Sequence, residues 1–320
     1  MKKWLFLSVI AFNMACNSRS HSDIPVIGFA DAFQDNTIEQ AKTGFTDALR
    51  NEGFDENKGT LKMIYRNAQG NIPTLTQIIK YFASEQVTLI ATNPSLSTIT
   101  AVQNTKNIPI FMMVSPTPTL MKINDAQGNP PANLFGVGET LDYIDTSFLL
   151  IPKVIKPRSG RLNVGMIFNQ SEPQSVESME RIRKLATGNN INLIYLPVNS
   201  TADVQLVTAS LLSKNIDVFF ANPDNIVFES FETIIQSCNQ KNIPVFTSEA
   251  GLVERGALAA YGADIYQWGY QAGREAALYL KTKSTVGIHW EMVTVRKKVY
   301  NPAAAKRYGI NIPSSFQPVQ

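Results

Sequence analysis

One structural unit occurs twice in this chain of 320 residues, once in each half. The unit is an apolar strand, an Asn-Pro turn, a helix, the tetrapeptide Lys-Asn-Ile-Pro and a second strand. In the first half VTLIATNPS (87–95) precedes KNIPIF (106–111), and in the second half IDVFFANPDN (216–225) precedes KNIPVF (241–246). The matched order and similar separation predict two structurally equivalent halves.

The rest of the chain alternates apolar strands with amphipathic helices. Near-continuous apolar strands between helices are typical of a parallel sheet covered on both faces. We therefore predict an α/β fold of two doubly wound parallel-sheet lobes, which suits a chain longer than the about 250 to 300 residues of one core. The predicted strands are 26–30, 61–65, 87–91, 108–114 and 134–137, then 162–168, 191–196, 216–221, 243–246 and 258–261, with second-half helices at about 174–187, 201–213 and 225–240.

The first fifteen residues have the pattern of a secretory signal. A positive start is followed by an apolar run over 4–12 and a small residue, Ala15, before Cys16. The apolar run is shorter than the ~20 residues of a membrane-spanning helix. We predict that residues 1–15 are removed and that the mature chain is exported and does not span a membrane.

Cys16 is the predicted lipidation site. Its thiol would take a diacylglycerol, and residues 16–24 would be a flexible tether between the bilayer and the folded body. Asn13 stands where such signals usually have Leu, so a plain cleaved signal with a free Cys16 is the alternative. The other cysteine, Cys238, lies on an apolar helical face and is predicted to be a buried thiol.

Neither charge nor motifs indicate nucleic-acid binding or catalysis. The net charge of +3 includes Lys2 and Lys3 of the signal, so the mature chain is close to neutral. The two histidines, His21 and His289, are not placed for a catalytic triad or a metal site. With no nucleophile elbow, phosphate-binding loop or zinc motif, we predict a protein that is not an enzyme and that holds no metal or cofactor.

The two Asn-Pro turns predict a ligand site. Ligands of open α/β sheets bind outside the carboxyl ends of the strands, so the turns would face each other across a cleft. Ser95 and the helix that follows it would receive a carboxylate, whereas Asp224 and Asn225 would accept from an ammonium group. The alternative for each of these residues is an ordinary helix N-cap.

Four motifs resemble one family of proteins. NAQG (67–70), NQSEPQS (169–175), PDN (223–225) and RGALAAYG (255–262) look like the ABC transporter substrate-binding family, which includes tryptophan- and tyrosine-binding lipoproteins. The resemblance covers about residues 25–313 and implies the type I periplasmic binding protein fold, in which two lobes close on a ligand about a three-strand hinge.

The resemblance also implies the lobe boundaries. Lobe I would contain residues 25–138 and about 264–285, and lobe II residues 139–263 and about 286–320. The chain would cross between the lobes near 138–141, near 262–266 and after a helix that ends near 283.

The predicted ligand-binding residues combine the turns, the family motifs and nearby aromatic side chains. Where the family usually has Thr-Asp-Pro, this chain reads Ser-Pro-Thr-Pro (115–118), so either Glu139, Glu172 or Glu249 compensates for the missing acid or the ligand differs. Phe29 and Phe33 flank a turn and would stack on an aromatic ligand, whereas Phe168 and Phe220 read more simply as core residues. The full set is Phe29, Phe33, Asn93, Ser95, Ser115, Glu139, Asn169, Ser171, Glu172, Ser175, Asp224, Asn225 and Glu249.

By this resemblance the chain is the substrate-binding lipoprotein of an ABC importer. It would act as a monomer, capture a small zwitterion such as an aromatic amino acid, and deliver it to a permease whose ATPase is a separate protein. A receptor of the same fold that signals ligand binding to a membrane partner is the alternative. The export signal argues against a sugar-binding repressor core.

Overall fold

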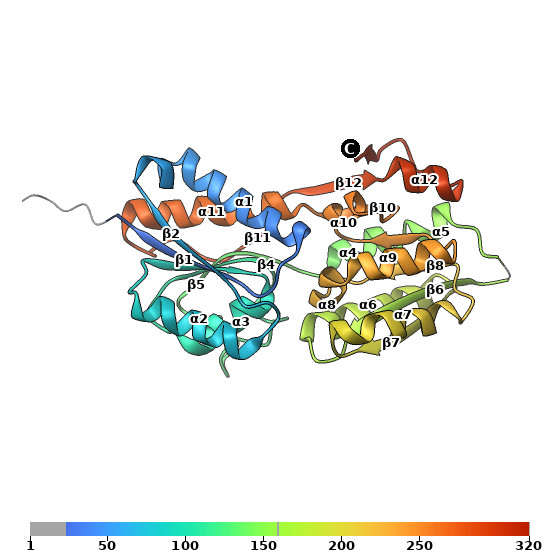
Figure 1. Cartoon of the computed structure of the whole chain (residues 1–320), viewed down its shortest axis with the longest axis horizontal. Helices are drawn as coiled ribbons and strands as arrows, with labels where there is room; N and C mark the ends of the chain where they lie inside the picture. The colour runs from blue at the N-terminus through green and yellow to red at the C-terminus, as the bar shows by residue number, and fades with distance from the viewer. Residues whose placement is uncertain (1–23, 159, 320) are drawn as a thin grey trace, which may run out of the picture.

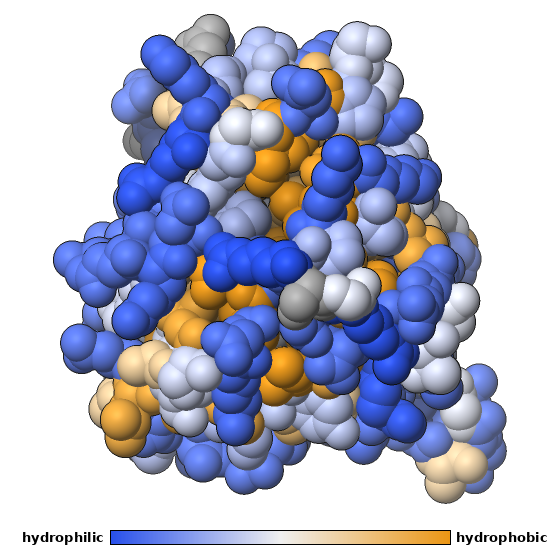
Figure 2. Space-filling view, turned by 90° about the vertical axis from the view of Figure 1, so that its right-hand side faces the viewer, coloured by the Kyte–Doolittle hydropathy of each residue, from blue (hydrophilic) through white to orange (hydrophobic). Residues whose placement is uncertain are grey.

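The computed structural model describes residues 24–158 and 160–319, which form two lobes side by side (Figure 1). The predicted signal and the lipidation site at Cys16 lie outside the described residues. Among the described residues, no helix combines the length and the apolar character needed to cross a bilayer. Figure 2 views the end of lobe II that faces away from lobe I, where the surface is mostly hydrophilic with apolar patches between the polar side chains.

Lobe I contains a sheet of six parallel strands in the order β2-β1-β3-β4-β5-β11. Helices α1 and α11 cover one face, and α2 and α3 cover the other (Figure 1). The elements are β1 (Val26–Asp31), α1 (Asn36–Asn51), a 3-10 turn η1 (Glu56–Lys58), β2 (Lys62–Asn67), α2 (Ile72–Ser84), β3 (Leu89–Asn93), α3 (Ser95–Asn104), β4 (Ile110–Pro116), β5 (Leu134–Glu139), α11 (Ile265–Thr282) and β11 (Glu291–Met292).

Lobe II contains a seven-stranded sheet in the order β7-β6-β8-β9-β10-β12-β13. Its strands are parallel except where β12 pairs antiparallel with β10. The elements are α4 (Asp142–Phe148), α5 (Ile151–Val154), β6 (Leu162–Asn169), α6 (Pro173–Gly188), β7 (Ile191–Val198), η2 (Thr201–Asp203), α7 (Val204–Leu212), β8 (Val218–Ala221), α8 (Asn225–Glu229), α9 (Phe231–Gln240), β9 (Val245–Thr247), α10 (Ala250–Glu254), β10 (Ala259–Ala263), β12 (Arg296–Tyr300), α12 (Pro302–Tyr308) and β13 (Gln317–Pro318).

The repeated unit occupies the same place in both sheets. β3 and β4 are the third and fourth strands counted from β2, and β8 and β9 are the third and fourth counted from β7. The predicted equivalence of the two halves and the predicted α/β class are therefore confirmed. One predicted helix, 225–240, is divided into α8 and α9 at Ser230.

The chain crosses between the lobes three times. The first two crossovers, between β5 and α4 and between β10 and α11, lie where they were predicted. The third follows α11, but the chain first adds β11 to the edge of the lobe I sheet beside β5. The crossover therefore lies between Met292 and Arg296, and the assignment of residues 286–292 to lobe II was wrong.

Two ion pairs join the three crossovers. Arg296, at the end of the third crossover, donates to Glu139 of the first, with 2.8 Å between Nη2 and Oε1. Nζ of Lys297 lies 2.9 Å from Oδ2 of Asp264, which belongs to the second crossover. Asp264 also caps α11 by accepting from the backbone of Gln267. The hinge therefore consists of three segments, and ion pairs connect the third segment to each of the other two.

The core of lobe I depends on a close approach of α1 and α11. A Cβ atom built on Gly269 of α11 would lie 1.9 Å from the carbonyl oxygen of Ala41, and one built on Gly44 of α1 would lie 2.0 Å from the carbonyl oxygen of Tyr266. Both neighbours are backbone atoms, so neither can move without moving its helix. The two glycines therefore set the distance between the helices.

Replacing Gly269 tests this packing. Gly269→Ala should destabilise the protein by about 1 to 3 kcal/mol or more, because the added methyl group overlaps backbone that is itself packed. The melting temperature measured by calorimetry should fall by several degrees. The matched control is Gly188→Ala at the end of α6, where a new Cβ meets nothing within 4 Å. An equal melting temperature for the two variants would contradict this account.

Candidate functional site

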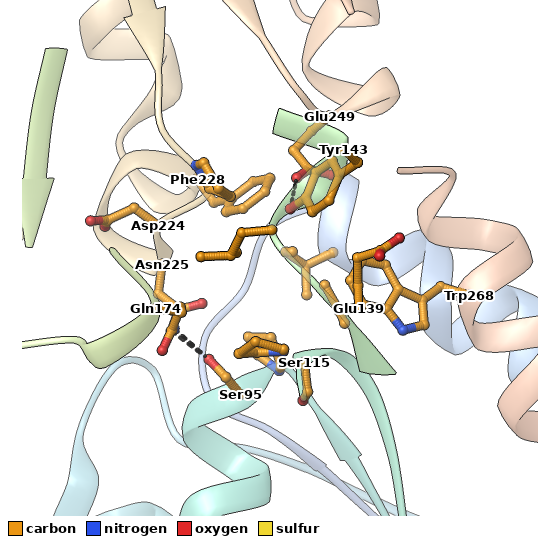
Figure 3. Close-up of a pocket in the computed structure, with 16 residues that line it drawn as sticks. Ser95, Ser115, Glu139, Tyr143, Gln174, Asp224, Asn225, Phe228, Glu249 and Trp268 are labelled. Atoms are coloured by element: carbon orange, nitrogen blue, oxygen red, sulfur yellow. Dashed lines mark hydrogen bonds between the residues drawn. The ribbon is translucent and has the colours of Figure 1, made fainter. Parts of the chain in front are cut away.

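A small cavity lies between the two lobes, beside the hinge (Figure 3). Its volume is about 50 Å³, and we call it the inner cavity. Both repeated turns contribute to its wall, as the sequence predicted for the carboxyl ends of the strands. The lining residues are Ile38, Pro94, Ser95, Val114, Ser115, Pro116, Glu139, Leu141, Tyr143, Gln174, Pro223, Asp224, Asn225, Phe228, Glu249 and Trp268.

An irregularity in β4 shapes the lobe I wall of the inner cavity. The register of β4 against β5 shifts between Met112 and Ser115, and Val114 within this bulge has a left-handed backbone with φ of 51°. This conformation is rare for a β-branched residue, and such strain is often found at functional sites. Val114 and Ser115 both line the cavity, so the bulge forms part of its wall.

Two glutamates that line the inner cavity each have an unpaired oxygen. Glu139 and Glu249 are only 1% and 2% exposed, and Oε2 of each has no hydrogen-bond partner. The other oxygen of Glu139 accepts from Arg296, and the other oxygen of Glu249 accepts from the hydroxyl of Tyr143 at 2.8 Å. A buried carboxylate oxygen without a donor is costly. The cavity therefore suits a ligand that donates hydrogen bonds.

Burial raises the pKa of both of these carboxyl groups. The pKa of Glu249 rises to about 7 because burial outweighs the hydrogen bond from Tyr143. The pKa of Glu139 is also raised by burial, although the nearby Arg296 guanidinium opposes the shift. A cation placed between the two groups would favour their ionised forms.

Polar side chains from both lobes meet at the boundary of the inner cavity. Gln174 of α6 donates to the hydroxyl of Ser95 at 2.8 Å, as Figure 3 shows, and Asn225 of α8 donates to the same hydroxyl at 3.3 Å. Glu172 accepts from both amides. Oε1 of Gln174 is buried without a partner. We call Ser95, Gln174 and Asn225 the gate, because they line this cavity and a second one beyond it.

The second cavity, the outer groove, has a volume of about 580 Å³. Lobe I supplies an apolar wall, and lobe II supplies a largely polar one. The groove is lined by Phe33, Gln69, Gly70, Ile72, Leu96, Ile99 and Met121 of lobe I, by Asn169, Ser171, Glu172, Pro173, Asn199, Ser200, Thr201, Ile226 and Glu229 of lobe II, and by the gate. Four predicted site residues, Phe33, Asn169, Ser171 and Glu172, therefore lie here rather than in the inner cavity.

Aromatic side chains on the inner cavity were missed in the sequence. Tyr143 and Trp268 lie just after the first and second crossovers, and Phe228 lies in α8 (Figure 3). The indole N–H of Trp268 donates to the carbonyl of Val137, which fixes the ring against β5. Each of these aromatic residues lies shortly after a predicted crossover or turn, and this position in the sequence could have identified it as a candidate site residue.

Other predicted residues have structural roles. Asp224 lines the inner cavity, but its oxygens accept from the backbone of Ile226, Val227 and Asn169 and from the hydroxyl of Ser175. It is the N-cap of α8, the alternative that the sequence left open. Ser175 is buried in this cap and lines neither the inner cavity nor the outer groove.

Asn93 and Phe29 are not part of the site. The side-chain amide of Asn93 is buried and donates to Asp31 and to the carbonyl of Ile38, which fastens the turn to its own lobe. Phe29 is fully buried against Phe45, because its position in β1 directs the ring into the lobe I core. The prediction that Phe29 stacks on a ligand was wrong. Phe168 and Phe220 are buried core residues, as expected.

An ion pair connects the lobes away from the cavity. Arg255, which follows α10, donates to Asp35 at 2.6 Å, and Asp35 is the buried N-cap of α1. The same guanidinium contacts Glu232 of its own lobe and lies over the ring of Phe231. Beside it, a Cβ on Gly251 would lie 2.4 Å from a methyl group of Thr37. The lobes are therefore in direct contact on this side.

Comparison with known proteins identifies the family. The family described as ABC transporter substrate binding protein matches residues 26–317, nearly all of the described structure. The chain belongs to this family. Members of the family are solute-binding proteins rather than enzymes, and substrate-binding proteins of ABC transporters act outside the cytoplasm. The predicted family, fold and absence of catalytic activity are confirmed.

Individual relatives agree with this assignment. A tyrosine-binding protein of Clostridioides difficile is 30% identical over 258 residues, which is 81% of this chain and 73% of the relative. A domain from Streptococcus pneumoniae in complex with L-Trp has a TM-score of 0.82 at 21% identity, over 92% of this chain and 99% of that one. A ligand-free, open substrate-binding protein from Clostridium difficile has a TM-score of 0.67 at 25% identity, over 93% and 99%.

The contact between Asp35 and Arg255 yields a prediction about closure. Asp35→Asn keeps an oxygen that can cap α1 but removes the charge that attracts Arg255, so the lobes should separate more readily. Small-angle scattering of the ligand-free protein should show a larger radius of gyration than for the unaltered chain. The control is Asp55→Asn, a capping residue whose contacts lie within lobe I. Identical scattering from Asp35→Asn and Asp55→Asn would rule out a role in closure.

Proposed function

We propose that this substrate-binding protein serves an ABC importer and captures a small molecule by its primary ammonium group. The observation that carries the proposal is the pair of buried, unpaired oxygens on Glu139 and Glu249, two residues that line the inner cavity. An ammonium group has three donors and no acceptor, which matches such a wall. Closure of the lobes excludes water, which strengthens the interaction.

The relatives support an aromatic ligand. One is named as a tyrosine-binding protein and another was solved with L-Trp. The rings of Tyr143, Phe228 and Trp268 line the inner cavity and offer cation–π contacts to the ammonium group of such a ligand. An amino acid would direct its carboxylate to the start of α3 at Ser95, where no side chain caps the helix. The inner cavity has room only for the ammonium end of the ligand, which we call its head. The rest of the ligand, its body, would extend past the gate.

Export and anchoring complete the proposal. Residues 1–15 direct secretion, Cys16 carries the lipid, and the residues up to Ile24 tether the lobes to the membrane, where the protein acts as a monomer. A permease with a separate ATPase receives the ligand. The proposal favours transport over signalling because the matching family is described as ABC transporter substrate binding protein.

The ammonium site is tested by Glu249→Gln. The substitution keeps the shape and the acceptor for Tyr143 but removes the negative charge, so affinity for tyramine or tyrosine measured by calorimetry should fall at least about tenfold. The melting temperature without ligand should not fall, since an uncompensated buried charge is also removed.

The matched control is Glu180→Gln, which neutralises an exposed residue of α6 paired with Arg183. Its affinity should equal that of the unaltered chain. Unchanged affinity in Glu249→Gln would remove Glu249 from the site.

The anchor is tested by Cys16→Ser. A serine hydroxyl cannot form the thioether, so the variant expressed in a bacterium should move from the membrane fraction to the soluble exported fraction. Cys238→Ser, which alters a buried thiol, is the control and should remain with the membrane. If Cys16→Ser stays in the membrane fraction, lipidation at Cys16 is not the anchor.

A further inference from the structure

All the charged side chains that line the two cavities are acidic. The inner cavity is lined by Glu139, Asp224 and Glu249, and the outer groove by Glu172 and Glu229. Among the described residues that line either cavity, there is no lysine, arginine or histidine. A ligand enclosed by these walls meets carboxylates from both lobes.

Two nearby arginines are already paired with acids, and one of these acids, Glu139, lines the inner cavity. Arg296 reaches Glu139 from the hinge, and its guanidinium lies over the ring of Tyr143. Arg255 is held between Asp35 and Glu232. The remaining positive features are the starts of helices in the lining, among them α3 and α6, and a helix N-terminus is equivalent to only about half an elementary charge. A carboxylate on the ligand would therefore be poorly compensated, whereas an ammonium group would be well compensated.

We infer that the physiological ligand is a monocation that lacks a carboxylate, such as an aromatic monoamine, rather than a zwitterionic amino acid. The inference rests on the proposed function and specifies its ligand class. The ammonium head lies in the inner cavity between Oε2 of Glu139 and Oε2 of Glu249. The three aromatic rings surround the head, and the body of the ligand extends through the gate.

The outer groove fits the rest of such a molecule. Its lobe I wall consists mainly of apolar side chains, with Ile72, Leu96, Ile99 and Met121 side by side in the lining. An aryl or alkyl body gains from burial against this wall. A carboxylate at the gate would instead lie beside Glu172, whose carboxyl oxygen already accepts from Gln174 and Asn225.

The protonation of the acids agrees with a cationic ligand. Burial, together with the charge of Asp224, raises the pKa of Glu172 well above its usual range, and burial raises the pKa of Glu249 to about 7. Both shifts come mainly from burial, which disfavours the ionised carboxylate. A bound cation beside these groups would favour their ionised forms, and a carboxylate on the ligand would oppose that effect.

The test compares ligands that differ only by the carboxylate. The chain from Ser20 onward, which contains both lobes, is titrated in a calorimeter with tyramine and tyrosine, with tryptamine and tryptophan, and with 3-(4-hydroxyphenyl)propionate, which has a carboxylate but no ammonium. We expect each amine to bind at least about tenfold more tightly than its amino acid, and the propionate not to bind.

The outcomes separate this inference from the proposed function. If an amino acid binds as tightly as its amine or more tightly, the inference is overturned while the ammonium-binding function stands. If neither the amines nor the amino acids bind, the proposed function fails and the inference fails with it.

A variant tests the electrostatic cause. Glu172→Gln removes the carboxyl group beside the gate that a bound cation would favour in its ionised form, so the ratio of amine affinity to amino-acid affinity should decrease at least about threefold relative to the unaltered chain. The control Glu180→Gln should leave the ratio unchanged. An equal ratio in all three proteins would mean that charge at the cavity does not select the ligand.

Discussion

The carboxyl group of Glu139 connects the hinge with the inner cavity. One of its oxygens accepts from Arg296 of the third crossover, and the other faces the cavity without a partner. A ligand that donates to the free oxygen therefore interacts with the segment about which the lobes rotate. Glu249 belongs to the opposite lobe, so in the proposed mode of binding a single ammonium group between the two glutamates would bridge both lobes and favour their closed arrangement. The same electrostatic interaction would then drive both binding and closure.

Such a site costs stability in the absence of ligand. Buried acceptors without donors and uncompensated carboxylates are unfavourable, and the raised pKa values of Glu139 and Glu249 reflect this. The strained backbone at Val114 lies on the same cavity. The remainder of the protein offsets these costs through two well-packed sheets and through contacts such as the pair of Asp35 and Arg255. The unfavourable features are confined to the place where a ligand would relieve them.

The sequence predicted the architecture better than the site. Strands and the repeated unit follow from local hydrophobic patterns, which the sheet order preserves in both lobes. Residues at the turns were harder to assign, because Asn93 and Asp224 have the same chemistry whether they hold a ligand or fasten a turn. Only the partners seen in three dimensions separate these roles. Phe228 and Trp268 reach the cavity from helices whose orientation depends on long-range packing, and β11 is too short to leave a pattern.

The position of α11 determines when lobe I is able to fold. Its partner α1 lies near the start of the chain, and the glycine contacts between them form only after residues beyond 265 are present. A ribosome makes the chain in order, so the apolar face of α1 stays uncovered until most of lobe II has been synthesised. Both lobes are therefore completed late, because lobe I waits for α11 and β11, and the lobe II sheet waits for β12 and β13. An exported chain with this order of contacts remains unfolded during synthesis for longer than one whose lobes are contiguous, which is compatible with passage through a narrow secretion channel.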